Sequence, residues 1–161
     1  MNAITYKEGF NLIKSDKMWL GNGFKSGNAY FSSPVSNDYA DGVFDKETGL
    51  VKFRNCCWYT SIDHGKRHQP MALMTYEDNL KFSKHKEIKE KGYQEYDNYN
   101  AIEVSFTDAI PSNYDGVMGV PISFLDKYSP EQFEIVGSDT DVKDGKLPEL
   151  IKPNWTGKID R

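Results

Sequence analysis

The sequence predicts an α/β fold, and within that class the second half of one, extended by β-hairpins. Three observations lead to this prediction. A helical pattern opens the chain with no strand before it, a polar turn at residues 45–49 separates two apolar stretches, and apolar residues alternate with polar ones over residues 101–106. Open α/β sheets ordinarily begin with a strand and a glycine-rich turn into a helix, so this chain is expected to start in the middle of a fold.

The opening helix is predicted by its cap and by its apolar face. Thr5 and Glu8 have the spacing of a capping box, in which each side chain bonds the backbone of the other residue. Tyr6, Phe10 and Ile13 then fall on one face of the helix. Because the strands that would cover this face are missing from a half-fold, we expect an exposed apolar stripe.

β-Forming residues predict a series of short strands along the rest of the chain. They are expected at residues 18–20, 28–32, 42–44, 50–53, 56–62, 101–106, 120–124 and 133–136, with 42–44 and 50–53 paired as a hairpin and 56–62 as a central strand. The lysine-rich residues 76–92 are expected to be partly helical, and Ser129 followed by Pro130 is typical of a helix start. No linker divides the chain, so we assign one domain to residues 1–137 and leave 138–161 as an unassigned polar tail.

The composition predicts a globular protein of the cytoplasm. The 161 residues include 38% hydrophobic and 14% aromatic side chains, which is enough to build a core. No stretch approaches the roughly 20 apolar residues of a membrane span, and the N-terminal residues lack the pattern of a signal peptide, so no membrane association is expected. Cys56 and Cys57 are neighbours, which disfavours a disulfide between them and favours reduced thiols in the cytosol.

The charge of the chain is unevenly distributed. Its formal net charge is −4, which argues against a free-standing nucleic-acid-binding protein. Residues 64–91 nevertheless carry seven lysines and arginines against four acids, whereas residues 92–136 carry one lysine against eight acids. The basic segment is either a DNA-facing edge or ordinary solvated surface.

The glycines at residues 21–27 suggest a comparison with nucleotide-binding loops. The sequence reads Gly-Asn-Gly-Phe-Lys-Ser-Gly after a predicted strand, but serine stands at position 26, where the dinucleotide-binding pattern requires glycine. No helical pattern follows, so no helix N-terminus is offered to a phosphate. We therefore interpret these residues as a loop that uses glycine for its turns.

The run from His64 to His68, which reads His-Gly-Lys-Arg-His, is the candidate functional site. On a helix the two histidines would share a face and could bind zinc, but Gly65 weakens such a helix and no third ligand is near. Contact with DNA fits better, because lysine neutralises phosphates and arginine bonds guanine edges. The alternative is an exposed basic turn whose cations pair loosely with acids such as Glu77 and Asp78.

Long stretches of the chain resemble a known family. Residues 96–104 read YDNYNAIEV, and residues 110–137 read IPSNYDGVMGVPISFLDKYSPEQFEIVG. Upstream, NAITYKEGFNLIK, MWLG and CCWYTSIDHGKRH match in the same order. Together these pieces, spread over residues 2–137, closely resemble the C-terminal part of the EcoRI-type adenine-specific DNA methyltransferases of bacteria and phages.

The resemblance implies an enzyme that transfers a methyl group from S-adenosylmethionine to the exocyclic amine of adenine in double-stranded DNA, after extruding the base. It also implies a partial Rossmann-like methyltransferase sheet, of which this chain supplies the second half. The family's catalytic loop, Asn/Asp-Pro-Pro-Phe/Tyr, is absent because none of the seven prolines adjoins another, and the family's cofactor turn lies further upstream. No catalytic or cofactor-binding residue is therefore assigned, and the chain alone is not expected to bind S-adenosylmethionine.

Two functional hypotheses follow from the resemblance. In the first, the chain is the C-terminal portion of an adenine-N6 methyltransferase of a restriction-modification or phage system, where it completes the sheet, contacts DNA and needs the missing N-terminal half for activity. In the second, it is a non-catalytic DNA-binding or interaction module derived from such an enzyme. In both, the residues expected to contact DNA are His64, Lys66, Arg67 and His68, and no metal site is expected.

Overall fold

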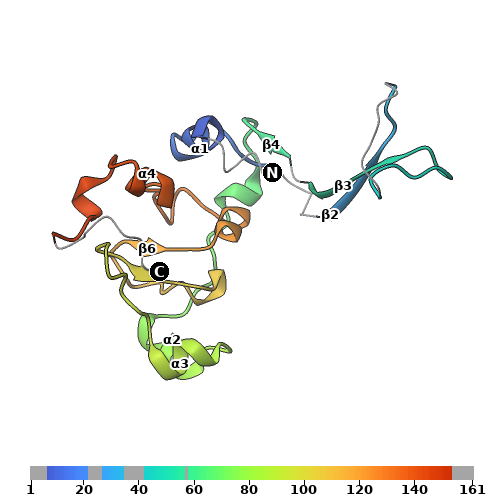
Figure 1. The fold of residues 1–161 in the computed structure, drawn as a ribbon. Coiled ribbons are helices and arrows are strands. Elements are labelled where there is room, and N and C mark those ends of the chain that lie inside the picture. The colour runs from blue at the N-terminus through green and yellow to red at the C-terminus, as the bar shows by residue number, and fades with distance from the viewer. Residues whose placement is uncertain (1–6, 22–26, 35–41, 57, 154–161) are drawn as a thin grey trace.

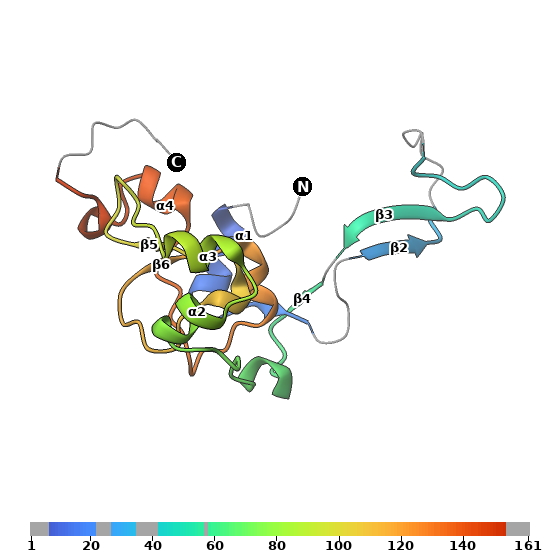
Figure 2. The same cartoon turned by 90° about the horizontal axis from the view of Figure 1, so that it is seen from below.

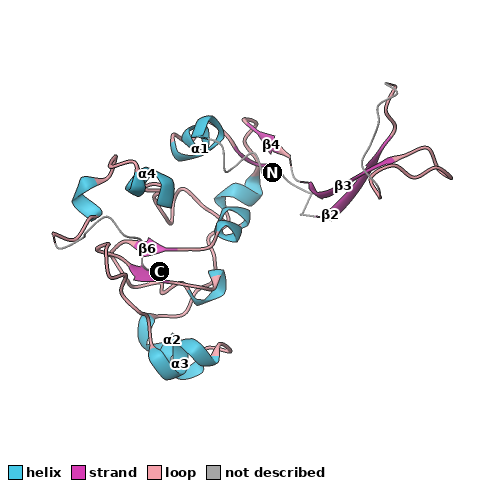
Figure 3. Ribbon diagram, viewed as in Figure 1, coloured by secondary structure: helices cyan, strands magenta, loops and turns pink. Residues whose placement is uncertain are grey.

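A computed structural model describes residues 7–21, 27–34, 42–56 and 58–153 of the chain (Figure 1). Its helices and strands are short and are joined by long irregular segments (Figure 3). The α-helices are α1 (Lys7–Lys14), α2 (Tyr76–Phe82), α3 (Lys86–Lys91) and α4 (Asp139–Lys143). The 3₁₀ helices are η2 (Gly65–His68), η3 (Thr107–Ala109), η4 (Ile122–Asp126) and η5 (Pro148–Leu150). The strands are β1 (Trp19–Leu20), β2 (Gly27–Phe31), β3 (Val51–Cys56), β4 (Tyr59–Thr60), β5 (Ile102–Glu103) and β6 (Met118–Gly119).

The molecule consists of a body and a β-hairpin arm that projects from it (Figures 1 and 2). The arm is built from β2 and β3, which pair antiparallel with Ala29 opposite Phe53 and Phe31 opposite Val51. These four side chains share one face of the hairpin, because side chains alternate along a strand. Val51 is buried, while Phe31 and Phe53 are about half exposed and meet edge to face with 5.7 Å between ring centroids. An aromatic contact on one face therefore helps to hold the arm together.

A tight turn over residues 45–49 confirms the turn predicted there. The Asp45 carboxylate accepts the Glu47 amide at 2.9 Å, and Gly49 has a φ of 69°, in the left-handed region that favours glycine. Phe44 and Val51 lie opposite each other across this turn, in a single bridge. The predicted hairpin is thus present, but the main partner of β3 is β2 rather than residues 42–44.

The strands β1 and β4 form the base of the arm. They pair antiparallel with Trp19 opposite Thr60, and the Gly21 amide donates to the Trp58 carbonyl at 2.9 Å. The prediction of one central strand over residues 56–62 is wrong. Strand β3 ends at Cys56 and β4 starts at Tyr59, and in the described part of the chain β4 pairs only with β1, so it is an edge strand.

The body packs around a hydrophobic cluster. Its buried members are Ile88, Tyr93, Ile102, Val104, Ala109, Ile110 and Phe124. They come from α3, β5, η3, η4 and the segments beside them, so these short elements share a core. The Tyr93 hydroxyl donates to the Ala109 carbonyl at 2.5 Å, and burial raises the pKa of Tyr93 to about 12.

A parallel pair of strands crosses the body. Ile102 of β5 lies opposite Met118 of β6, and amides on the β5 side donate to Val117 at 3.1 Å and to Gly119 at 2.9 Å. Parallel strands need a long connection, and here it passes through η3. The strand predicted over residues 101–106 is therefore confirmed, but it is shorter than expected. With three two-stranded sheets and few helices, the described chain is a mixed α/β protein.

Two predicted strands are absent from the described part of the chain. Residues 120–124 enter η4, with Pro121 at its N-cap; proline has no amide to donate to a sheet. Residues 133–136 are irregular, although Phe133 and Ile135 pack against the core. At both places turns bring apolar residues to the core. The alternation of apolar and polar residues that is typical of a strand therefore does not apply there.

The helical predictions are confirmed for α1 and for the lysine-rich α2 and α3. The exposed stripe expected on α1 is wrong for Ile13, which is buried, and Phe10 is half buried. Tyr6 and Thr5 lie outside the described residues. The helix expected at Ser129 is also wrong, because the Ser129 carbonyl closes a single turn that does not continue.

Residues 138–153, in which the sequence predicts no element, fold onto the body. Ser138 and Asp141 form a capping box at the start of α4, with the Ser138 hydroxyl accepting the Asp141 amide at 3.2 Å. Val142 and Leu147 are buried. The apolar pattern of this segment is too short to reveal a helix of five residues.

None of the helices in the described ranges has both the length and the apolar character needed to cross a bilayer.

Replacing Ile110 by alanine should lower the free energy of unfolding by about 2–5 kcal/mol, because this side chain is fully buried in the core. The matched control is Ile122→Ala, which removes the same atoms from a side chain that is 55% exposed. Its effect should stay within about 0.5 kcal/mol. Urea unfolding measures both variants, and equal losses would contradict the assignment of the core.

Candidate nucleic-acid interface

The candidate site is the turn formed by residues 63–68, which follows β4. His64 has an extended backbone and precedes η2, and its carbonyl accepts the Arg67 amide at 3.0 Å. A 3₁₀ helix has about three residues per turn, so neighbouring side chains point in different directions. From one short turn Arg67 therefore reaches Asp16 and His68 reaches Glu131, while both contact Asp63.

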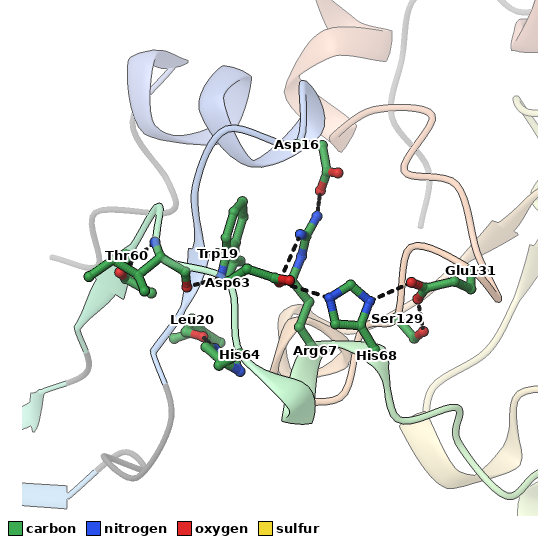
Figure 4. A network of polar contacts seen from close by, with 11 residues as sticks. Asp16, Trp19, Leu20, Thr60, Asp63, His64, Arg67, His68, Ser129 and Glu131 are labelled. Atoms are coloured by element: carbon green, nitrogen blue, oxygen red, sulfur yellow. Dashed lines mark hydrogen bonds and ion pairs between the residues drawn. The ribbon is translucent and has the colours of Figure 1, made fainter.

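Arg67 is held on three sides by residues of the same chain (Figure 4). Its guanidinium donates to the Asp16 carboxylate, lies 3.5 Å from the Asp63 carboxylate and covers the Trp19 ring at 3.8 Å from the centroid. Only 9% of the Arg67 side chain is exposed. Trp19 is fixed in turn, because its ring nitrogen donates to the Ile62 carbonyl at 3.1 Å. Cation–π contact and ion pairing thus join the end of α1, β1 and this turn.

His68 bridges two carboxylates. Its Nε2 lies 2.8 Å from Asp63, and its Nδ1 bonds Glu131. Glu131 also accepts the Ser129 hydroxyl at 2.8 Å. An imidazole donates from both nitrogens only when it is protonated, so this setting favours the charged form. Because Glu131 follows η4 in the body, the bridge extends the contacts of the turn into the body. We define the Arg67 network as Asp16, Trp19, Asp63, Arg67, His68 and Glu131.

The Arg67 network shifts the pKa values of its titrating members. Hydrogen bonds to Glu131 and Asp63 raise the pKa of His68 above its ordinary value. The bond with His68 lowers the pKa of Asp63 and that of Glu131. Each shift stabilises the charged form of its group, so the network favours a charged histidine between two carboxylates.

His64 and Lys66 are placed differently from each other. The His64 Nε2 lies 2.9 Å from the Leu20 carbonyl, and its Nδ1 is buried with no hydrogen-bond partner among the described residues. Lys66 is half buried and forms no ion pair within the described ranges. Among the four residues predicted to contact DNA, Lys66 is therefore the one whose charged group is available to a partner.

The acids that pair with the turn are not those expected from the sequence. Loose pairing with Glu77 and Asp78 is wrong, because Arg67 pairs with Asp16 and Asp63 instead. Asp16 precedes Arg67 by 51 residues, and no pattern within the turn indicates that contact. Sequence reasoning missed Asp16 and Trp19 for this reason.

The described residues contain no metal centre, and of the glycine-rich residues 21–27 they include only the two ends. No group of three histidine, cysteine, aspartate or glutamate side chains within the described ranges could hold a metal ion. A Cβ built on Gly21 would lie 2.4 Å from the Trp58 ring, so this glycine permits close packing. Residues 22–26 lie outside the described residues, and strand β2 begins at Gly27.

Comparison with known proteins relates the chain to methyltransferases. The family model described as "Adenine-specific methyltransferase EcoRI" matches residues 1–156. The chain is 41% identical over 140 residues to the Type II methyltransferase M.EcoRI of Escherichia coli. It is 33% identical over 144 residues to the Type II methyltransferase M.MgeORF184P of Mycoplasma genitalium and 30% identical over 144 residues to M.MpnI of Mycoplasma pneumoniae.

The alignments cover most of this chain but a minor part of each relative. They include 84% of the chain and 40% of M.EcoRI, and 83% of the chain and 41% of M.MgeORF184P. The chain thus spans about two fifths of the length of the curated relatives that it matches. No solved structure matches the chain.

Replacing Arg67 by alanine should lower the free energy of unfolding by about 1–2 kcal/mol. The change removes the guanidinium that covers the Trp19 ring, and it leaves the carboxylates of Asp16 and Asp63 without this partner. The matched control, Lys66→Ala, removes a neighbouring cation that has no ion pair in the described chain, and should change stability by less than about 0.5 kcal/mol. Urea midpoints distinguish the two variants. An Arg67→Ala protein as stable as the Lys66→Ala protein would show that the contacts are not structural.

The stabilising effect of His68 should depend on pH. Because its folded pKa is raised, its contribution is complete below the unfolded value of about 6.5 and is lost as pH rises through the folded pKa. The urea midpoint of the unmodified chain should therefore exceed that of His68→Gln by more near pH 6 than near pH 9. A difference of the same size at both pH values would mean that the imidazole is not charged in the fold.

Proposed function

Because the chain belongs to the EcoRI adenine-specific methyltransferase family, we propose that it is part of an S-adenosylmethionine-dependent enzyme of the restriction-modification type. In this proposal the whole enzyme methylates the exocyclic amine of adenine in double-stranded DNA. The observation that carries the proposal is the family match over residues 1–156, together with 41% identity to M.EcoRI.

We assign the chemistry to the part of the family's length that this chain does not span. The resemblance implies a catalytic loop with two adjacent prolines, and the chain contains no such pair. Serine at position 26 departs from the glycine pattern of a cofactor-binding turn, and Gly21 packs closely on Trp58. S-adenosylmethionine would supply the methyl group from a site formed outside this chain, and the chain would contribute structure and DNA contacts.

The parallel pair β5–β6 supports a role in completing a Rossmann-like sheet. Within the described ranges β6 pairs only with β5, so its other edge has free backbone groups. That edge borders a hollow of about 1090 Å³, to which Met118 and Val120 contribute apolar surface. Parallel strands occur mostly in sheets with both faces covered. Addition of a strand from the rest of the enzyme would satisfy this edge and fill part of the hollow.

For the turn at residues 64–68 we propose a division of roles. Lys66 contacts a DNA phosphate, since its ammonium has no acidic partner in the described chain. His64, Arg67 and His68 position the turn and the base of the arm, because each side chain already bonds at least one residue of this chain. Direct DNA contact by Arg67 would first require breaking its contacts with Asp16, Asp63 and Trp19.

A second candidate function is a non-catalytic DNA-binding or interaction module. The observation that favours it is the core around Val104 and Ile110, which the described chain builds without another polypeptide. Such a module would bind DNA in the absence of S-adenosylmethionine and would not contribute to methyl transfer. The two functions therefore differ in their behaviour when the chain is joined to the rest of a family member.

The direct test is a chimaera in which this chain replaces the matched segment of M.EcoRI. With labelled S-adenosylmethionine, the chimaera should transfer methyl groups to adenine in duplex DNA. The chain alone, and M.EcoRI with the segment deleted, should transfer none. A chimaera that folds and binds both DNA and S-adenosylmethionine but transfers no methyl group would contradict the enzymatic role and favour the module.

A further inference from the structure

The turn between α2 and α3 exposes cations and an aromatic ring together. Residues 81–91, which we name the lysine-rich segment, contain five lysines and two glutamates. All five lysines are exposed, and Phe82 is 71% exposed beside them. Between Asn79 and Glu87 the sequence holds three of these lysines and no acid. Positive charge is therefore concentrated at the turn itself.

This charge is largely unneutralised by the rest of the chain. Lys84 pairs with Asp108 at 2.6 Å, and Lys81 interacts electrostatically with Glu77 without forming an ion pair. Lys86, Lys89 and Lys91 form no ion pair in the described ranges. Lys143 and Lys146 are paired with acids, and other exposed lysines such as Lys46 form no ion pair in the described ranges but are spread more widely along the sequence. Screening limits charge effects to about 8–10 Å at moderate salt, so a local positive surface can act despite a net charge of −4.

The segment is anchored to the body and presents these side chains from a fixed backbone. Asn79, Ser83 and Ile88 are buried beneath it. The Ser83 hydroxyl accepts the His85 amide at 3.2 Å, which fixes the turn between the helices. His85 stacks on Phe106 with 3.7 Å between centroids, and its Nε2 lies 2.8 Å from Asp108. A cationic surface that is already ordered loses little backbone entropy when it binds a partner.

From this charge and shape we propose that the lysine-rich segment binds the sugar–phosphate backbone of double-stranded DNA. Lys81 and Lys86 neutralise phosphates, and Lys84, whose side chain is 74% exposed, exchanges its weak surface pair with Asp108 for a phosphate. Phe82 packs against the apolar parts of sugars or base edges. The proposal rests on the proposed function, which makes DNA the partner, and it goes beyond the turn at residues 64–68. In that turn most of the polar groups are already bonded within the chain, whereas in the lysine-rich segment most of the cations are not.

The test uses the full chain and a short fluorescent duplex in a salt titration. The triple variant Lys81→Ala, Lys84→Ala, Lys86→Ala should bind roughly tenfold or more weakly near 0.1 M salt. The slope of log affinity against log salt should become shallower by about 2–3, since each phosphate contact contributes about 0.9. Its urea midpoint should be nearly unchanged, because exposed ion pairs such as Lys84–Asp108 contribute little to stability.

The matched control removes the same charge from exposed positions elsewhere. Lys14→Ala, Lys17→Ala, Lys46→Ala should leave the salt slope within about half a unit of the unmodified chain. A separate variant, Phe82→Ala, should weaken binding without changing the slope, because it removes an apolar contact and no charge. This second readout distinguishes a defined surface from a general attraction of cations to DNA.

Three results would overturn the proposal. In one, the lysine triple variant keeps the affinity and slope of the unmodified chain. In another, the control variant loses as much binding as the triple variant. In the third, the unmodified chain binds vesicles of anionic lipid and no duplex DNA. Methyl transfer by the M.EcoRI chimaera would still support the proposed function in each case, so the two proposals fail separately.

Discussion

The contact on which the rest of the site depends is the guanidinium of Arg67, held over Trp19 and between Asp16 and Asp63. Exposed ion pairs are weak, but a nearly buried cation with an aromatic face on one side gains more from its partners. This contact connects the end of α1 and β1 to the turn after β4, at the base of the arm. His68 then continues the connection to Glu131 in the body. These polar contacts thus join the strands at the base of the arm to α1 and to the body.

Local sequence patterns predicted the helices and the turn, whose hydrogen bonds join residues close together in the sequence. The apolar period of α1, the polar turn at residues 45–49 and the lysine-rich helices were all expected, and the resemblance over residues 2–137 predicted the family. The strands predicted at 120–124 and 133–136 failed for a physical reason. The apolar side chains of Phe124 and Phe133 pack against each other with 5.4 Å between ring centroids, and turns rather than strands bring them to the core. Apolar composition alone does not distinguish such turns from strands.

The candidate site could be located from the sequence, but its internal contacts could not. Histidines, lysine and arginine within five residues marked the turn, whereas Glu131 lies 63 residues beyond His68 and carries no signal of that contact. The structure changes the interpretation of these cations. A cation that is paired and nearly buried, such as Arg67, contributes to position, whereas in our proposal a cation that stays exposed on an ordered surface contacts DNA. That distinction moves the expected DNA contact from Arg67 toward the lysines around Phe82.

Hydrogen exchange of the full chain, with and without a duplex DNA, tests this division of roles most directly. We expect DNA to slow amide exchange over residues 81–91, where the cations are exposed. Exchange at residues 64–68 should change little, apart from the neighbourhood of Lys66, because Arg67 and His68 keep their partners within the chain. Slowed exchange confined to residues 64–68, with none over residues 81–91, would contradict DNA contact by the lysine-rich segment.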